Sequence, residues 1–233
     1  MNDFTLPMKK REKIAGWIYL PIHTVLMGLF ILPVVVTLLQ NNGITLDSVQ
    51  VNTIYYCIGL AYILIFMTPF LKENFVMKKK ANMLSTVGIG YFANTIMNYV
   101  VTIILALFTT QLTNPNSEAV YDAVSLNAYN MFAVAAIMAP IVEEVLFRGV
   151  IFGTIRQKSR ILAYVVSILL FSVYHLWTSV ALNGDWSVLI YMIQYVPAGL
   201  TLAWSYEKTG SIWTSIFLHM TINAVAVFAS MAM

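Results

Sequence analysis

The sequence contains little charge and almost no cysteine, and each scarcity excludes a class of protein. Only 10% of the 233 residues are charged, whereas a soluble domain averages about 25%. The single cysteine, Cys57, excludes an internal disulfide and any metal site built from several cysteines. There is no glycine-rich phosphate loop and no internal repeat of the kind found in many transporters. Nucleic acid is not an expected partner of this chain.

The sequence is instead rich in long apolar runs. Hydrophobic residues make up 60% of the chain, and the mean hydropathy is +0.79. Seven segments approach the ~20 residues that a helix needs to cross about 30 Å of hydrocarbon. They are roughly 17–40, 54–71, 84–110, 128–150, 161–180, 187–205 and 211–231. Because these runs are too long and uniform for barrel strands, they predict an all-α, polytopic transmembrane helical bundle of about seven spans.

The basic residues alternate along the chain in a way that predicts its orientation. The basic residues outside the apolar segments lie before the first segment or in the connections after the second, fourth and sixth segments. The connections after the first, third and fifth segments contain acidic residues but no Lys or Arg. The basic residues are Lys9, Lys10, Arg11, Lys13, Lys72, Lys78, Lys79, Lys80, Arg148, Arg156, Lys158, Arg160 and Lys208. The positive-inside rule therefore predicts a multi-pass protein of the cell membrane with a cytoplasmic N-terminus and an extracytoplasmic C-terminus.

No boundary divides the chain into separate domains. The first apolar segment follows a basic stretch but is too long for the apolar region of a cleaved signal peptide, so we expect it to be a membrane helix. The longest polar interruption, 111–127, is expected to be an outside loop. We expect one integrated membrane domain, with three helices and this loop in 1–127 and the catalytic core in 128–233.

Two adjacent carboxylates, Glu143 and Glu144, lie near the end of the fourth segment. An ionisable side chain within a span costs at least ~2.5–3.5 kcal/mol on insertion scales. Arg148 follows Glu144 at i+4, which predicts an ion pair on one helix face. Glu143 is rotated about 100° away and has no such partner. Pro140 precedes it and is expected to kink the helix. A kink beside an unpaired carboxylate predicts a cavity.

The three histidines lie in apolar segments and differ in their neighbours. His23, in the first segment, is expected to be a solitary histidine bonded to a nearby carbonyl. His175 has Phe171 at i−4 as a possible pocket wall, and His219 has Asn223 at i+4. At a rise of about 1.5 Å per residue, Glu143 and the two later histidines lie at similar depths of roughly 16–20 Å above the basic loops. One carboxylate and two imidazoles from three helices are thus expected to meet in one layer.

Three short motifs occur in order on the fourth, fifth and seventh segments. They are EExxxR at 143–148, FxxxH at 171–175 and HxxxN at 219–223. Each occurs often by chance, but the three in order inside apolar segments are fairly specific. Over about 128–227 the chain resembles the CPBP family, which contains CAAX-type prenyl-protein endopeptidases and bacteriocin-processing or immunity proteins and is also called Abi.

The resemblance implies an intramembrane endopeptidase with its site between the fourth, fifth and seventh helices. By the family pattern, Glu143 is the general base and His175 helps to hold the attacking water. His219 and Asn223 bind the tetrahedral intermediate. Peptide hydrolysis needs these functions, an activated water and donors for the developing oxyanion.

The resemblance also implies supporting residues and raises the question of a metal. Glu144 and Arg148 would orient the fourth helix, and Phe171 would stand beside the catalytic groups. The family is often called a metalloprotease, and Glu143, His175 and His219 form a plausible zinc ligand set. The chain has no HExxH motif and Asn223 is a poor zinc ligand, so we favour a glutamate-activated water with no cofactor, and zinc remains the alternative.

Two other functions remain open. The same buried Glu and His residues are compatible with a proton relay or ion site in a small transporter. A non-enzymatic immunity or scaffold protein is the third possibility. For the endopeptidase, the partners are the lipid bilayer and a peptide or protein substrate in the membrane. Prenylated CAAX proteins, pheromone precursors and bacteriocin leaders all fit.

Overall fold

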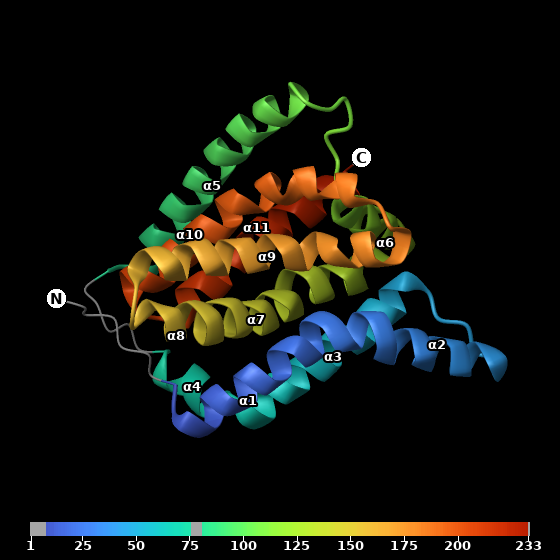
Figure 1. The fold of residues 1–233 in the computed structure, drawn as a ribbon, viewed down its shortest axis with the longest axis horizontal. Coiled ribbons are helices and arrows are strands. Elements are labelled where there is room, and N and C mark those ends of the chain that lie inside the picture. Colours follow the sequence, from blue (N-terminus) through green and yellow to red (C-terminus); the bar gives the residue numbers. More distant parts are fainter. Residues whose placement is uncertain (1–7, 76–80, 233) are drawn as a thin grey trace.

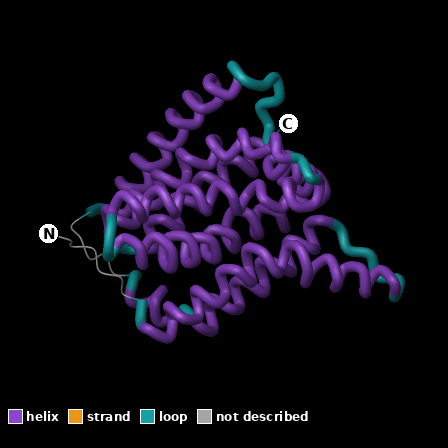
Figure 2. The backbone as a smooth tube through the Cα atoms, viewed as in Figure 1, coloured by secondary structure: helices purple, strands orange, loops and turns teal. Residues whose placement is uncertain are grey.

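The described residues, 8–75 and 81–232 of a computed structural model, form helices joined by short loops, and no strand occurs among them (Figure 2). The all-α fold class predicted from sequence is confirmed. The helices are α1 (Lys10–Pro21), η1 (Ile22–Ile31), α2 (Leu32–Asn41), α3 (Ser48–Phe66), α4 (Thr68–Glu73), α5 (Met83–Ala106), α6 (Pro115–Phe132), η2 (Ala133–Met138), α7 (Ala139–Glu144), η3 (Val145–Phe152), α8 (Gly153–Arg156), α9 (Arg160–Asn183), η4 (Trp186–Tyr195), α10 (Val196–Thr209) and α11 (Ile212–Met231).

Six helical stretches within the described ranges are long and apolar enough to cross a membrane. They are Lys10–Asn41, Ser48–Phe66, Met83–Ala106, Arg160–Asn183, Trp186–Thr209 and Ile212–Met231. The fourth predicted segment, 128–150, is not among these six. It is helical throughout, but it contains three charged side chains and runs through η2, α7 and η3, where wider π-type turns alternate with α-helix. The chain is a multi-pass membrane protein, and the count of seven spans remains a prediction.

The stretch 111–127 is not simply a loop, and this expectation was wrong. Helix α6 begins at Pro115, and the side chain of Asn114 accepts a hydrogen bond of 2.9 Å from the main-chain N–H of Ser117. An Asn cap followed by proline is a favourable helix start, because the side chain satisfies a free N–H and proline supplies a helical φ. The helix breaks at Asn127, which has φ −155° and ψ 90°.

The helices form a central layer with one further group on each side (Figure 1). The run from α7 to α8 packs with α9, α10 and α11, and these four lie side by side. Helices α1 and α3 cover one face of this layer, where α1 contacts η3 and α3 contacts α7. Helix α5 crosses the opposite face against α10 and α11. The two carboxylates at the end of α7 are therefore enclosed from both sides.

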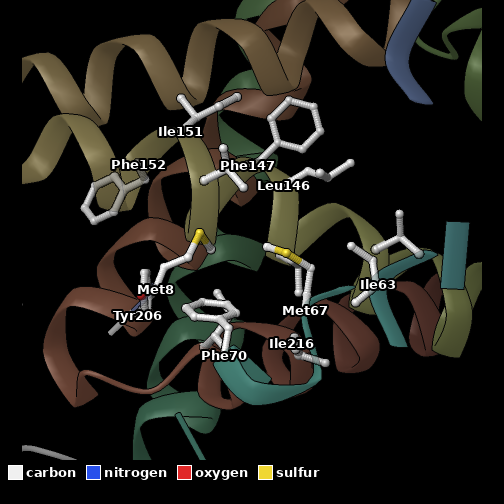
Figure 3. Packing of buried hydrophobic residues seen from close by; sticks show 14 of the residues in the cluster. Met8, Ile63, Met67, Phe70, Leu146, Phe147, Ile151, Phe152, Tyr206 and Ile216 are labelled. Atoms are coloured by element: carbon white, nitrogen blue, oxygen red, sulfur yellow. The ribbon is translucent and has the colours of Figure 1, made fainter. Parts of the chain in front are cut away.

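The core is centred on the motif-bearing helix, since all eight residues of η3 are buried. Figure 3 shows Leu146, Phe147 and Ile151 of η3 beside Met67 and Phe70 from the N-terminal third of the chain. The first helices thus pack directly on the helix that carries the carboxylates.

Two glycines allow especially close approaches of helices in this region. A Cβ added at Gly16 of α1 would lie 2.4 Å from Cγ2 of Val150 in η3. A Cβ at Gly199 of α10 would lie 3.3 Å from the main-chain Cα of Ile168 in α9. No other residue type permits these approaches without movement of a neighbour. Gly16 therefore lets α1 approach η3 closely, and Gly199 does the same for α10 and α9.

Ion pairs gather at one end of the bundle. Lys9 lies 2.6 Å from Glu73, and the hydrogen bond and charge of Glu73 raise the pKa of Lys9. Glu207 pairs with Arg156, and Arg160 lies 2.9 Å from it. Lys78, Lys79 and Lys80, on which the predicted orientation partly rests, lie outside the described residues.

Candidate active site

Three predicted residues come together from three helices. Glu143 is the fifth residue of α7, His175 lies on α9 and His219 lies on α11. Oε2 of Glu143 lies 3.8 Å from Nε2 of His175 and 4.0 Å from Nε2 of His219. The side chain of Glu143 is only 5% exposed. One carboxylate oxygen therefore faces two imidazole nitrogens, too far for direct hydrogen bonds but close enough for one water beside them to bond both the oxygen and a nitrogen.

Pro140 positions Glu143 at a change in helix type. It lies at the start of α7, directly after the π-type turns of η2. A proline inside a helical run lacks an N–H and its ring crowds the preceding turn. A wider turn before it accommodates both effects. The residue one turn later, Glu143, consequently borders a cavity, whereas its neighbour Glu144 is fully buried.

Glu144 is the centre of a charged network. Its Oε1 lies 3.0 Å from Nη1 of Arg148, and both side chains are 0% exposed, so the predicted i,i+4 pair forms. Ser215 donates to the other carboxylate oxygen. Nδ1 of His219 lies 2.8 Å from Oε1. Glu144 therefore joins α7 to α11 and orients one of the two imidazoles, in addition to pairing within its own helix.

Phe171 stands between Arg148 of the charged network and the ring of His175. The guanidinium carbon of Arg148 lies 4.2 Å from the centre of the Phe171 ring, a cation–π arrangement. The ring of His175 meets Phe171 edge-on at 4.5 Å. Arg148 also approaches the carbonyl of Gly199 at 3.4 Å. These contacts make Phe171 a wall behind His175, as its spacing indicated.

The hydrogen bonds of the two imidazoles define which nitrogen is free. Nδ1 of His175 lies 2.7 Å from the carbonyl oxygen of Phe171. Carbonyl and carboxylate oxygens only accept hydrogen bonds, so Nδ1 donates in His175 and, toward Glu144, in His219. In the neutral rings, both Nε2 atoms then carry a lone pair directed to the space beside Glu143.

Asn223 lies one helical turn beyond His219 on α11. Its Nδ2 donates to the carbonyl of Ala135 at 2.8 Å, which ties α11 to η2. A side-chain amide has two N–H donors, so one remains for another acceptor. Asn223 borders both cavities described next.

Two cavities meet at the site. One of about 530 Å³ is bordered by Glu143 and Tyr56, with mainly apolar residues from η1, α2, α6 and η2. The second, of about 460 Å³, is bordered by His219 and by amide side chains that include Asn94 and Gln194. Both share Asn116, Val120, Ala135, His175 and Asn223. A chain that passes from one cavity to the other passes His175 and Asn223.

One partner of Glu143 was not found from sequence. Tyr56 of α3 donates a hydrogen bond of 2.8 Å to Oε1 of Glu143. The two residues are 87 positions apart, so no local spacing connects them.

The expectation for His23 was wrong. Among the described residues its ring bonds no carbonyl, and instead lies 3.4 Å from the hydroxyls of Tyr19 and Tyr174. Tyr19 precedes His23 at i−4, a spacing that was visible in the sequence. The ring is fully buried in a cluster of tyrosines.

The donor types around Glu143 suit a zinc ion. Two imidazoles and a carboxylate form a common catalytic set, and each Nδ1–H is held by an oxygen, as is usual behind zinc-bound histidines. Among residues 8–75 and 81–232, however, no group of three or more His, Cys, Asp or Glu side chains has the arrangement of a metal site. The chemical types of these three residues therefore suit zinc, whereas their arrangement is not that of a metal site.

Comparison with known proteins gives a family model that matches the part of the chain with the motifs, and several similar proteins. Residues 125–225 match the family model described as type II CAAX prenyl endopeptidase Rce1-like. "Putative membrane peptidase YdiL" of Bacillus subtilis is 30% identical over 113 residues, which are 48% of this chain and 41% of that protein. "UPF0177 protein YbdI" of Lactococcus lactis is 24% identical over 156 residues, 67% of this chain and 79% of that protein.

A second Lactococcus lactis protein, "UPF0177 protein YxdF", is 30% identical over 90 residues, 39% of this chain and 44% of that protein. The chain thus spans less than half the length of YdiL and YxdF. No solved structure matches it significantly.

Proposed function

We propose that this chain is an intramembrane endopeptidase. It hydrolyses a peptide bond of a membrane-associated peptide or protein with a water activated by Glu143. The proposal draws on the match of residues 125–225 to the family model of CAAX-type prenyl endopeptidases. The observation that carries the proposal is the position of Oε2 of Glu143, 3.8 and 4.0 Å from two imidazole nitrogens.

The first step is activation of water. A water beside the two groups donates one hydrogen to Oε2 of Glu143 and the other to Nε2 of His175, which leaves an oxygen lone pair free to attack. As the oxygen bonds to the substrate carbonyl carbon, Glu143 takes the first proton. A positioned base of this kind accelerates reactions by about 10²–10⁴-fold.

The second requirement is a partner for the oxyanion that forms. The free N–H of Asn223 is one donor. His219 is the other when its Nε2 has taken a proton from solvent before the attack, a proton that it keeps when the intermediate collapses. Glu144 stabilises that imidazolium because it accepts the Nδ1–H at 2.8 Å. Fixed donors in a site shielded from water are the largest single contribution in many acyl-transfer enzymes. Glu143 then returns its proton to the leaving amine as the C–N bond breaks.

The paired cavities support cleavage inside a chain rather than at its end. The catalytic groups lie where a space of about 530 Å³ meets one of about 460 Å³, so substrate has room on both sides of the scissile bond. Prenylated CAAX proteins, pheromone precursors and bacteriocin leader peptides are the candidate substrates, and the bilayer delivers each of them.

Zinc is the alternative to a metal-free mechanism. Glu143, His175 and His219 would be its ligands, and it would supply Lewis-acid polarisation of the water. The role proposed for Asn223 is the same in either case, whereas Glu144 would hold the Nδ1–H of a neutral, zinc-bound His219 in place of an imidazolium.

We also propose the orientation and the organisation of the chain. The N-terminus is cytoplasmic and the C-terminus extracytoplasmic in the cell membrane. Residues 1–127 and 128–233 form one integrated domain whose second part is the catalytic core. A reporter fused after residue 233 should be extracytoplasmic, and one inserted at 72–80 should be cytoplasmic.

The test of function is cleavage by purified protein. Wild type and Glu143→Gln are incubated in liposomes with prenylated and leader-bearing peptides, and products are identified by mass spectrometry. Cleavage by wild type alone supports the proposal. Ion-dependent flux in the same liposomes without cleavage favours the transporter, and neither activity favours an immunity or scaffold protein.

A further inference from the structure

His23 of η1 is the outer end of a polar cluster that no motif covers. Its ring is 0% exposed and stacks on Tyr55 with 4.4 Å between ring centres. The main-chain carbonyl of His23 accepts a hydrogen bond of 2.7 Å from the Tyr55 hydroxyl. Nδ1 lies 3.4 Å from the hydroxyl of Tyr19, and Nε2 lies 3.4 Å from that of Tyr174.

The inner end of the cluster is the catalytic glutamate. The hydroxyl of Tyr56 lies 3.4 Å from that of Tyr174 and 2.8 Å from Oε1 of Glu143. Tyr174 is adjacent to His175 on α9. Helices η1, α3 and α9 therefore meet near Oε1 of Glu143, the carboxylate oxygen other than the one that faces the imidazoles.

Each tyrosine hydroxyl has one hydrogen to donate, and this limit decides which group donates in each contact of the cluster. Tyr56 must give its only hydrogen to Glu143, because a carboxylate only accepts. In the contact between Tyr174 and Tyr56, only Tyr174 can therefore donate. The Tyr174 hydroxyl also lies 3.2 Å from that of Tyr55, which gives its own hydrogen to the carbonyl of His23, so Tyr174 shares its one hydrogen between Tyr55 and Tyr56. Tyr174 then accepts from Nε2–H of His23, whose Nδ1 accepts from Tyr19. Each hydroxyl that donates toward the carboxylate also accepts a hydrogen from behind, which strengthens the final bond.

We propose that Tyr56, with Tyr174 behind it, is a positioning residue for Glu143. The inference rests on the proposed role of Glu143 as the base. It gives the N-terminal helices a part in the reaction, since Tyr56 comes from α3 and the cluster ends on η1.

The physical need for such a residue comes from the carboxylate itself. The last torsion of a glutamate side chain is broad and two-fold, so backbone position alone does not fix where the oxygens point. Tyr56 holds Oε1 at 2.8 Å, and Oε2 is then the oxygen that faces His175 and His219. Without Tyr56, the fraction of molecules with Oε2 in place falls.

The kinetic test compares three tyrosine-to-phenylalanine variants that each lose one hydroxyl. Tyr56→Phe should lower kcat by about 10–100-fold, the loss expected for one hydrogen bond to a charged group, and leave KM and Tm near wild type. Tyr174→Phe should lower kcat by a smaller factor than Tyr56→Phe, because Tyr174 does not contact Glu143 directly. The control is Tyr62→Phe on the same helix, whose hydroxyl donates to the carbonyl of Ala15 at 3.1 Å away from the site, and it should keep the wild-type kcat.

A second measurement does not require activity. The infrared difference between wild type and Glu143→Gln identifies the carboxylate bands of Glu143. Tyr56→Phe should shift these bands, and Tyr62→Phe should leave them in place.

The two measurements separate this inference from the proposed function. If no substrate is cleaved, the endopeptidase proposal fails, and the infrared bands alone decide whether Tyr56 holds Glu143. If substrate is cleaved but Tyr56→Phe has the kcat and the carboxylate bands of wild type, the endopeptidase stands and the positioning role is wrong. An equal fall in kcat and Tm for Tyr56→Phe and Tyr62→Phe would also overturn it, because packing alone explains that result.

Discussion

Glu143 and Glu144 are neighbours on one helix, yet they occupy opposite environments. Glu144 has Arg148 at 3.0 Å as a counter-charge, is fully buried, and borders neither of the two cavities at the site. Glu143 borders the larger of them, accepts a hydrogen bond from the hydroxyl of Tyr56, and faces two imidazoles at 3.8 and 4.0 Å rather than a Lys or Arg. A compensated carboxylate is suited to hold structure, whereas an uncompensated one beside a cavity is suited to exchange a proton.

The roles of Glu143 and Glu144 are not fully separate. Through His219, Glu144 also contacts the catalytic layer, since the 2.8 Å bond to Nδ1 orients the ring whose Nε2 faces Glu143. The comparison therefore predicts two kinds of damage. Loss of Glu143 should affect the reaction alone, and loss of Glu144 should affect folding first and the reaction through His219.

The largest effect is expected for Glu143→Gln. Glutamine keeps the shape of the side chain but is not a base, so turnover should fall by about 10²–10⁴-fold. The protein should accumulate in the membrane at wild-type levels and unfold at the wild-type temperature. Turnover near that of wild type would remove Glu143 from the mechanism.

Next in size is Glu144→Gln, which leaves Arg148 buried without its counter-charge. Breaking a buried pair by removing one partner costs about 3–5 kcal/mol, so Tm and yield in detergent should both fall. Turnover per folded molecule should also fall, because His219 loses its anionic acceptor.

Glu207→Gln is the matched control for that variant. Glu207 pairs with Arg156 and Arg160 at the end of the bundle, so its loss should lower Tm without lowering turnover per folded molecule. A stable but inactive Glu144→Gln would contradict the separation of roles and show that the two carboxylates share the chemistry.

A smaller effect is expected for Ser215→Ala. Ser215 donates to Glu144, and hydrogen bonds to charged groups contribute about 1.5–3 kcal/mol, so the free energy of unfolding should drop by roughly that amount. The comparison variant is Ser172→Ala, whose hydroxyl bonds only the carbonyl of Ile168 in its own helix. Equal Tm values for the two variants would mean that Ser215 does not support the Glu144 network.

The smallest expected effect is that of chelation. If Glu143 activates water without metal, activity should persist after dialysis against a strong chelator, and zinc measured by mass spectrometry should be well below one per chain. Activity that is lost to chelator and restored by zinc would make His175 and His219 ligands, and would leave the contrast between Glu143 and Glu144 unchanged.

Features that depend on near neighbours in the chain were predictable. The Glu144–Arg148 pair follows from i,i+4 spacing, and the contact of His175 with Phe171 has the same origin. The start of α6 was readable too, because Asn114 before proline is a helix cap, yet we expected a loop there. The helical class followed from the length of the apolar runs.

Contacts between distant segments were not predictable. Tyr56 lies in an apolar helix, where a tyrosine usually fills space or lies at the membrane interface. Its register against α7, 87 positions away, depends on side-chain packing around η3 that no local pattern encodes. The same holds for the bond between Glu144 and His219, which joins residues 75 positions apart.

The local nature of the Glu144–Arg148 pair has a consequence for the biosynthesis of the protein. Helices are made from the N-terminus onward, so the motif helix reaches the membrane before α9 and α11 exist. Arg148 follows Glu144 by four residues, and the two enter as a neutral unit, which lowers the insertion cost of each charge. Glu143 finds Tyr56 already inserted with α3. The contact between Tyr56 and Glu143 can thus form first, and His175 and His219 join the site last.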